Sequence, residues 1–125
     1  MAILLFVVSM TALTSCKKTS KELIVGKWEC TAASFTEDGV TQPVSYLNNM
    51  IWEFTANGTV ISSLNEDTNN GTATYAVVDS ELTITYTDED EIEIEKYTIK
   101  ELTNSKLLLE KSIDNRIITY EFKKV

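Results

Sequence analysis

Short runs of β-branched and aromatic residues, separated by Asn, Gly, Asp and Ser, recur along the chain. Such runs with turn residues between them are typical of an antiparallel sandwich or barrel. Neither an internal repeat nor a second class of composition interrupts the pattern, so one domain is expected over residues 23–125. The pattern predicts eight strands, at residues 24–35, 51–55, 60–64, 73–78, 82–87, 92–100, 106–111 and 116–123.

Alternation of apolar and polar positions assigns one face of each strand to the core. In the first strand it directs inward the even-numbered residues Gly26, Trp28, Cys30 and Ala32. In three later strands the same rule directs inward Trp52, Phe54, Leu82, Ile84, Tyr86, Ile118, Tyr120 and Phe122. Bulky inward residues of this kind either fill an eight-stranded barrel or line a cavity for one small ligand, and both outcomes stay open.

The sixth predicted strand changes phase along its length. Its first apolar positions are Ile92 and Ile94, whereas its later ones are Tyr97 and Ile99. A β-bulge near Lys96 would account for this change. The polar positions of its first half are then expected on the outer face, and all of them are acidic: Glu91, Glu93 and Glu95.

Loop lengths alternate along the chain. The connections at 36–50 and 65–72 are long, whereas Asn57-Gly58 and Asp79-Ser80 make tight turns. In an up-and-down meander, alternate loops lie at opposite ends, so one end is predicted to be closed and the other to form an elaborated mouth. In the second long loop, NEDTNNG at 65–71 lacks the Gly and Glu that a calcium loop needs, so a hairpin loop is expected there.

Composition excludes several classes of chemistry. The chain carries a net charge of −8 and no histidine. The acidic balance argues against nucleic acid, which needs clustered Lys and Arg. The lack of imidazole removes the commonest general acid–base group. No catalytic residue, metal site or cofactor is assigned, because Cys30 is expected to be a buried apolar side chain and the acidic run 88–95 a solvated turn.

An apolar segment at residues 3–12 precedes the domain. It is too short to cross a bilayer, which takes ~20 helical residues, and it ends in small residues, as a secretory signal does. Leu13-Thr14-Ser15-Cys16 resembles the bacterial lipobox, in which a cysteine is acylated before cleavage. The resemblance implies a lipoprotein signal peptide over residues 1–15, lipid attachment at Cys16, and a lipidated tether over residues 16–22 whose lysines meet anionic headgroups.

Gly26-Lys27-Trp28 at the start of the first strand matches the G-x-W motif of lipocalins. With WEFTANGTV at 52–60 and TYAVVDSELTIT at 74–85, the domain resembles the small lipocalin-like lipoproteins of Bacteroidetes. The resemblance implies an all-β fold, an eight-stranded antiparallel up-and-down barrel in which the loop 36–50 is the lid over the mouth. In place of the arginine that stacks on this tryptophan in lipocalins, the last strand offers Lys123 and Lys124.

The predicted mouth is acidic, and the lysines gather toward the tether end. Its loops carry Glu37, Asp38, Glu66, Asp67, Asp88, Glu89, Asp90, Glu91 and Asp114. An acidic rim attracts cations and repels anions, so a small neutral or cationic apolar ligand is expected, and fatty-acid anions are expected to bind poorly. Candidate ligand contacts are Tyr46, Leu47, Trp52, Phe54, Tyr86, Arg116 and Tyr120. Arg116 is the one inward residue near the mouth that could bind an anion.

These features predict a membrane-anchored lipoprotein with a non-catalytic binding function. Its expected partners are the membrane, through the N-terminal lipid, and a small hydrophobic ligand. The alternative is a filled β scaffold whose acidic loops bind a protein or another envelope component. Basic residues follow Cys16, whereas surface-exported lipoproteins of the resembling phylum carry acidic ones there, so the periplasmic face of the bacterial outer membrane is the expected location.

Overall fold

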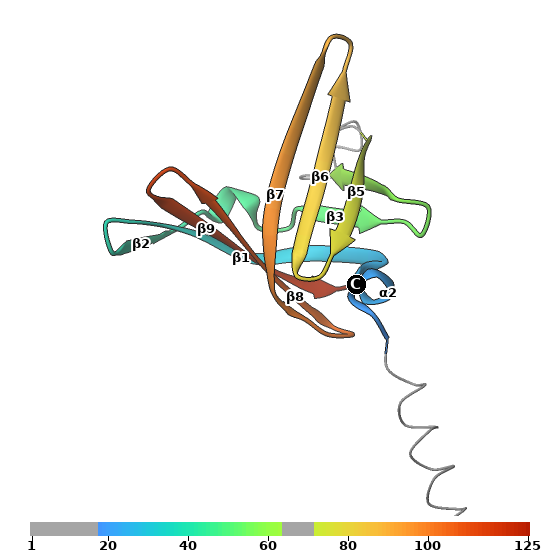
Figure 1. Cartoon of the computed structure of the whole chain (residues 1–125). Helices are drawn as coiled ribbons and strands as arrows, with labels where there is room; N and C mark the ends of the chain where they lie inside the picture. The colour runs from blue at the N-terminus through green and yellow to red at the C-terminus, as the bar shows by residue number, and fades with distance from the viewer. Residues whose placement is uncertain (1–17, 64–71) are drawn as a thin grey trace, which may run out of the picture.

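The computed structural model of the chain describes residues 18–63 and 72–125 (Figure 1). The predicted signal peptide at 1–15, the lipidation site Cys16 and the loop at 65–71 lie outside the described residues. The described part contains α2 (Ser20–Ile24), η1 (Ser45–Leu47) and the strands β1 (Gly26–Glu37), β2 (Val40–Pro43), β3 (Ile51–Phe54), β4 (Thr59–Ser63), β5 (Thr72–Val78), β6 (Glu81–Asp88), β7 (Glu91–Leu102), β8 (Lys106–Ile113) and β9 (Arg116–Lys124).

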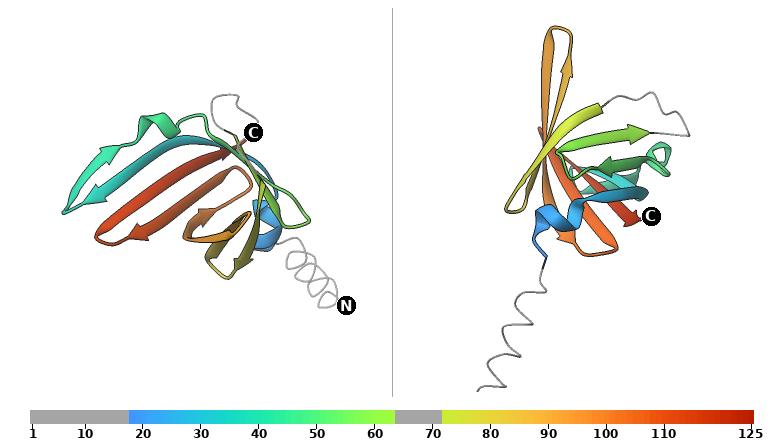
Figure 2. Two further views of the ribbon diagram at one scale, coloured as in Figure 1. Left: turned by 90° about the horizontal axis from the view of Figure 1, so that it is seen from above. Right: turned by 90° about the vertical axis from the view of Figure 1, so that its right-hand side faces the viewer.

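Eight antiparallel strands close into a barrel. β1 pairs with β3, each strand from β3 onward pairs with the next, and β9 returns to β1. The ring closes along a long seam that runs from the pair Trp28–Lys124 to the pair Glu37–Arg116. Figure 2 shows how strongly the sheet twists as it closes. The predicted all-β, eight-stranded antiparallel barrel is confirmed, and each predicted strand is present within a few residues of its expected bounds.

The segment 36–50, predicted as a lid loop, is largely regular instead. β1 continues to Glu37, and Asp38 and Gly39, with φ of 53° and 79°, turn the chain into β2. Positive φ at both central residues is the geometry of a type I′ hairpin turn, for which Asp-Gly is a preferred sequence. Through η1 the chain then reaches β3, so β2 and β3 occupy successive stretches of the same edge of β1.

A bulge in β1 changes which residues face the core. The register with β9 shifts between Cys30 and Ala32, so one residue of β1 has no direct partner there. A bulge moves the following side chains to the opposite face. Ala33 is therefore buried and Ala32 exposed, and the prediction that Ala32 faces the core is wrong.

β7 has no bulge near Lys96, where one was predicted. Its pairing with β6 is continuous along the whole hairpin, and its irregularity lies at Lys100, opposite β8. Ile92 and Ile94 point outward, with 70% and 57% of their surface exposed. Three residues thus share the inner face with Tyr97, contrary to the predicted outward placement: Glu91, Glu93 and Glu95. This part of the inner face lies beyond the packed core, so its carboxylates stay hydrated or find partners.

An aromatic core fills the closed half of the barrel. Trp52 lies at its centre, with ring centroids 5.2–6.2 Å from those of four other aromatic residues: Phe54, Tyr97, Tyr120 and Phe122. Such pairs contribute ~0.5–1.5 kcal/mol each beyond their burial. Fully buried aliphatic side chains surround this cluster: Ile24, Leu82, Ile84, Leu107 and Leu109. Of the two outcomes left open by the sequence, a filled interior therefore describes the closed half.

Three residues, Gly26, Trp28 and Lys124, form what we call the closed-end latch. The Trp28 indole N–H donates to the carbonyl of Ile24 at 2.8 Å, and the Lys124 ammonium lies 4.7 Å from the Trp28 ring centroid. Lys124 also donates to the carbonyls of Leu23 and Val25, at 3.3 and 2.7 Å. Its partial burial lowers the pKa of the Lys124 ammonium. The latch joins both ends of the domain and holds α2 against the barrel.

The end of the predicted tether is helical. The Thr19 hydroxyl accepts a hydrogen bond from the Glu22 N–H at 3.3 Å, and the Glu22 carboxylate accepts from the Thr19 N–H at 3.2 Å. This capping box starts α2 and holds the pKa of Glu22 below its usual value. Ile24 at the end of α2 is fully buried, so the helix belongs to the barrel. Among the residues that the structure describes, no helix has the length and apolar character needed to cross a membrane.

Gly26→Ala tests the latch. Gly26 has φ of +134°, and an added Cβ would lie 2.5 Å from Cε of Lys124, so the lysine would have to leave its place. We expect a loss of about 1–3 kcal/mol in the free energy of unfolding, measured by urea denaturation. Gly39→Ala is the control, because Gly39 also has positive φ but no atom within 4 Å of the added Cβ. Equal losses for the two variants would contradict the role of the Lys124 contact.

Candidate functional site at the barrel mouth

Beyond the core, β7 and β8 separate and open the barrel. Their pairing runs only from Leu102–Leu107 to Thr98–Glu110. Among the described strands, β7 then continues beside β6 alone, and β8 beside β9 alone. Two arms result: the β6–β7 arm, which comprises residues 84–95, and the β1–β9 arm, which comprises β2, η1 and the mouth ends of β1, β8 and β9. Figure 1 shows the β6–β7 hairpin rising apart from β8 and β9.

An apolar groove of about 210 Å³ lies on the β1–β9 arm, which we call the mouth groove. Its lining comes from β1, β9, η1 and the residue before η1: Phe35, Val44, Tyr46, Leu47, Arg116, Ile118 and Tyr120. Four of the seven predicted ligand contacts meet here: Tyr46, Leu47, Arg116 and Tyr120. The groove therefore brings together candidates that lie 70 positions apart in sequence, and η1 with Val44, which the sequence pattern left in a lid loop, forms one of its sides.

Arg116 is already paired at the rim of the mouth groove. Its Nε donates to Oε2 of Glu37 at 2.9 Å, across the pair that joins the ends of β1 and β9. Both side chains are about half exposed, so the pair contributes little to stability. The pairing does, however, neutralise the one cationic side chain that lines the groove.

Two predicted contacts, Trp52 and Phe54, lie below the groove in the core. Both are buried, and each packs edge-on to other aromatic rings. Trp52 lies next to Tyr120, with 6.2 Å between ring centroids, so it supports the floor of the groove from beneath. The structure therefore does not bring Trp52 and Phe54 to the surface of the groove.

A polar cluster of Tyr97, Glu95 and Lys111 bridges the two arms. The Tyr97 hydroxyl donates to Oε2 of Glu95 at 2.6 Å, and the Lys111 ammonium lies 3.2 Å from Oε1 of the same carboxylate. The lysine also lies 5.4 Å from the centroid of the Tyr97 ring. With only 17% and 23% of their side chains exposed, Lys111 and Glu95 form the most buried ion pair among the described residues.

The sequence contained a signal for this cluster. Glu95 lies two positions before Tyr97 in one strand, and Lys111 two positions after Leu109 in the next, so each shares the inner face with a core residue. The apolar residues Ile92 and Ile94 masked that signal, because the alternation was assigned to them rather than to the acidic positions.

Tyr86, the remaining predicted contact, stands on the β6–β7 arm near Glu95. Burial and the carboxylates of Glu95 and Glu93 raise the pKa of Tyr86 to about 12. Burial and the Glu95 carboxylate likewise raise the pKa of Tyr120 to about 12. Burial and the hydrogen bond to Glu95 raise the pKa of Tyr97 as well. Tyrosines from three strands thus surround one carboxylate between the arms.

The inner face of the β6–β7 arm is acidic beyond this cluster. Register places on it Tyr86, Asp88, Glu91 and Glu93, and residues 84–95 contain no Lys or Arg. Lysines lie instead at the closed end: Lys18, Lys21, Lys27, Lys106, Lys123 and Lys124. Lys106 pairs there with Glu101 and Glu121, and Lys123 pairs with Glu29. The mouth is therefore acidic in the described residues, as expected, whereas the closed end carries carboxylates as well as lysines.

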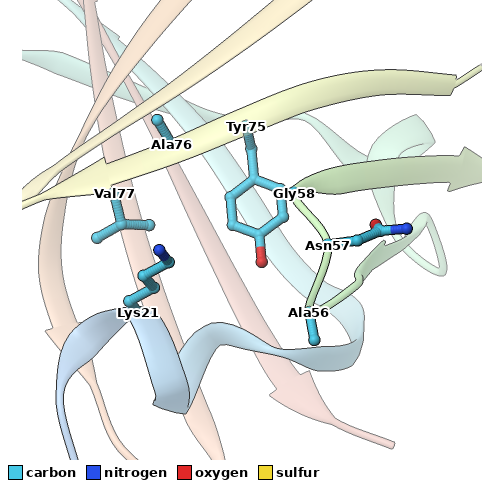
Figure 3. A pocket seen from close by; sticks show the side chains of 7 residues that line it. All are labelled: Lys21, Ala56, Asn57, Gly58, Tyr75, Ala76 and Val77. Atoms are coloured by element: carbon cyan, nitrogen blue, oxygen red, sulfur yellow. The ribbon is translucent and has the colours of Figure 1, made fainter.

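A second hollow of about 240 Å³ lies at the closed end (Figure 3). It is lined by Lys21 of α2, by the β3–β4 turn and by β5. The Tyr75 hydroxyl donates to the carbonyl of Thr55 at 2.6 Å, which fixes the ring that forms one wall. The sequence-based candidates do not include this hollow, and none of the predicted ligand contacts lines it.

The described residues offer little reactive chemistry. Within residues 18–63 and 72–125, no three His, Cys, Asp or Glu side chains gather so that they could hold a metal ion. Cys30 is buried, and its burial raises the pKa of the thiol. A thiol with a raised pKa is a poor nucleophile at neutral pH. What the arrangement of the mouth can provide is an apolar contact surface opposite an acidic one.

The tyrosine cluster predicts loss of stability at alkaline pH. Tyr86 and Tyr120 have pKa values of about 12 in the fold against about 10 in an unfolded chain, so the folded state keeps protons that the unfolded state has lost. These tyrosines should therefore leave the free energy of unfolding unchanged below about pH 9 and lower it between about pH 10 and 12, by at most ~1.4 kcal/mol per pH unit for each tyrosine. Denaturant titrations across this pH range measure the free energy of unfolding. In Tyr86→Phe we expect this free energy to fall less steeply with pH. A flat profile from pH 10 to 12 would contradict the burial of these hydroxyls.

Comparisons with known proteins agree with this architecture. The family model described as a lipocalin-like domain matches residues 24–109. A crystal structure of a lipocalin-like protein from Bacteroides uniformis superposes with a TM-score of 0.58 at 16% identity, covering 82% of this chain and 99% of that one. No curated protein matches the chain. Because the family model spans most of the described barrel, the chain belongs to the family of lipocalin-like domains.

Proposed function

We propose that this protein is a membrane-anchored lipoprotein that binds a small neutral or cationic apolar molecule in its mouth groove, without catalysis. The observation that carries the proposal is the pairing of an apolar groove on the β1–β9 arm with an acidic inner face on the β6–β7 arm. Lipocalin-like domains are generally non-catalytic binding proteins, which supports the same reading.

The volume of the mouth groove is enough for only part of a ligand, so we expect the ligand to bind at the mouth and not deep inside the barrel. Pockets for drug-sized ligands measure roughly 300–1,000 Å³, whereas the mouth groove holds about 210 Å³. The aromatic core occupies the space beneath it. A ligand would therefore place one ring or a short apolar chain against Leu47, Ile118 and Tyr120, and leave its polar part between the arms.

The charges of the site select against anions. Arg116, the cation that lines the groove, is engaged by Glu37. Lys111, the inward cation of β8, is engaged by Glu95. Free carboxylates of the β6–β7 arm then dominate the potential at the mouth, and a potential of that sign lowers the local concentration of anions and raises that of cations.

The anchoring part of the proposal is supported by the lipobox-like sequence that ends in Cys16. Lys21 and Lys27 lie at the closed end and, with Lys18, have no ion-pair partner among the described residues, so they suit an anionic membrane surface. The mouth would then point away from the membrane. We place the protein on the periplasmic face of the bacterial outer membrane, since Lys17 and Lys18 directly follow the cysteine.

The second candidate function is a filled scaffold that binds a protein or envelope component through its acidic loops. The packed core of the closed half favours this alternative. The two candidates differ in one respect that can be measured, because a scaffold takes up no small apolar molecule.

The proposed class of ligand can be tested with a matched series of amphiphiles that share one hydrocarbon chain and carry a cationic, neutral or anionic head. We expect the cationic and neutral members to bind in the mouth groove, and the anionic member to bind at least about tenfold more weakly. Tyr46→Ala should weaken binding, because this exposed side chain lines the groove. Val78→Ala, which removes an exposed apolar side chain at the closed end, is the matched control. Preference for the anion would contradict the ligand class, and no uptake by any member would favour the scaffold.

Cys16→Ser tests the anchor. In the producing bacterium we expect the wild-type protein in the membrane fraction with a mass increase from acyl chains, and the variant unacylated and soluble. Cys30→Ser is the control, because this buried cysteine should not affect fractionation. Acylation of neither cysteine, with the wild-type protein soluble, would refute the lipoprotein assignment.

A further inference from the structure

On the side that faces β8, the mouth half of β7 is a sheet edge without a strand partner among residues 18–63 and 72–125. β7 pairs with β6 along residues 91–98, but with β8 only from Thr98 onward. On the side that faces β8, the backbone of residues 91–97 therefore has no ladder partner among the described strands. Across the gap, Lys111–Ile113 of β8 pair with β9 alone, so a wedge with two open edges lies between β7 and β8. Figure 1 shows β7 diverging from the β8–β9 hairpin.

The edge of β7 has two chemically different faces. Its outer face carries Ile92 and Ile94, both mostly exposed. Its inner face carries Glu91, Glu93 and Glu95. An open edge is a template for an added strand, and exposed apolar side chains beside it give that strand something to bury.

Charge decides which strand can be added. A second copy of this chain would place the carboxylates of Glu91, Glu93 and Glu95 against their own kind, and like charges directly opposite each other are destabilising. A strand with basic residues at the same positions would form opposite-charge pairs instead. Its alternate residues would lie beside Ile92 and Ile94, so they would have to be apolar.

We propose that the edge formed by residues 91–95 of β7 binds an extended segment of another protein in which basic and apolar residues alternate. The segment adds to the sheet as a strand in the wedge between β7 and β8. Its basic side chains face the carboxylates of Glu91 and Glu93 on the inner face, and its apolar side chains cover Ile92 and Ile94 on the outer face.

The wedge limits how far the strand can enter. It is closed below by the pairing of Thr98 with Glu110 and crossed on the inner face by the ion pair of Lys111 with Glu95. The added strand therefore meets β7 from Glu91 to about Glu95 before it reaches this barrier. This interaction goes beyond ligand binding in the mouth groove: it shares with that proposal the carboxylates of Glu91 and Glu93, but none of the residues that line the groove. Peptide binding and amphiphile binding are measured separately, so either proposal can fail without the other.

The test uses the full chain in detergent and a short peptide of alternating lysine and valine. We expect the peptide to bind and to slow hydrogen exchange at those backbone amides of residues 91–95 that point away from β6, since these amides gain ladder partners. A peptide of the same composition with its lysines in one block should bind at least about tenfold more weakly. Equal binding of the two peptides, or binding without protection of β7, would overturn the proposal, as would no binding at all.

Variants of the protein make the test specific for the edge. Glu93→Lys should lower the affinity for the alternating peptide about tenfold, because one attractive cross-strand pair becomes repulsive. Glu81→Lys makes the same charge change at the exposed closed end of β6 and is the matched control. Ile94→Thr should also weaken binding while it keeps a good strand former at an exposed position. If Glu81→Lys lowered the affinity for the peptide as much as Glu93→Lys does, binding would depend on the net charge alone and the proposal would be wrong.

Discussion

The short pairing between β7 and β8 is the constraint on which the rest of the structure depends. Up to Thr98 and Glu110 the strands form a closed ring around the aromatic core, and beyond them the sheet divides into two arms. The division is tolerated because it lies beyond the core, where water can satisfy the open backbone groups. Lys111 and Glu95 stand at the point of division, where a barrel closed to its end would carry apolar inward residues. The mouth groove, the acidic inner face and the open edge of β7 all follow from this one separation.

A small barrel of eight strands can be filled or can hold one ligand, and in this chain the closed half is filled while the mouth carries an apolar groove. The closed half is packed by Trp52 and its aromatic neighbours, and the latch of Gly26, Trp28 and Lys124 joins its two chain ends. Lys124 lies over Trp28, at the place where the resemblance to lipocalins implies an arginine. The space left for the proposed ligand is therefore at the mouth, where side chains from η1, β1 and β9 form an apolar surface.

The sequence predicted the barrel because strand alternation is a local property, and eight strands could be read from it within a few residues. The structure differs from the prediction where the alternation of inward and outward positions along a strand was assigned one residue out of step. The bulge in β1 exposes Ala32, and the continuous β7 turns Ile92 and Ile94 outward, so Glu95 moved from the predicted outer face to the inner one. The Asp38-Gly39 hairpin lay in a segment that the sequence pattern left as a lid loop.

For the site, the alternation of inward and outward positions identified Tyr120 and Arg116. It did not show how deep Trp52 and Phe54 lie, because their depth depends on long-range packing that a local pattern does not encode.

The central claim is that the mouth of this lipocalin-like barrel retains a neutral or cationic apolar molecule. Native mass spectrometry of the protein, purified in a mild detergent from the cells that make it, tests this most directly, because the mass of a retained molecule identifies its class. The account predicts a bound species that is neutral or cationic and that is lost from Tyr46→Ala. A retained fatty-acid anion, or a bare protein mass with no uptake of apolar dyes, would contradict it.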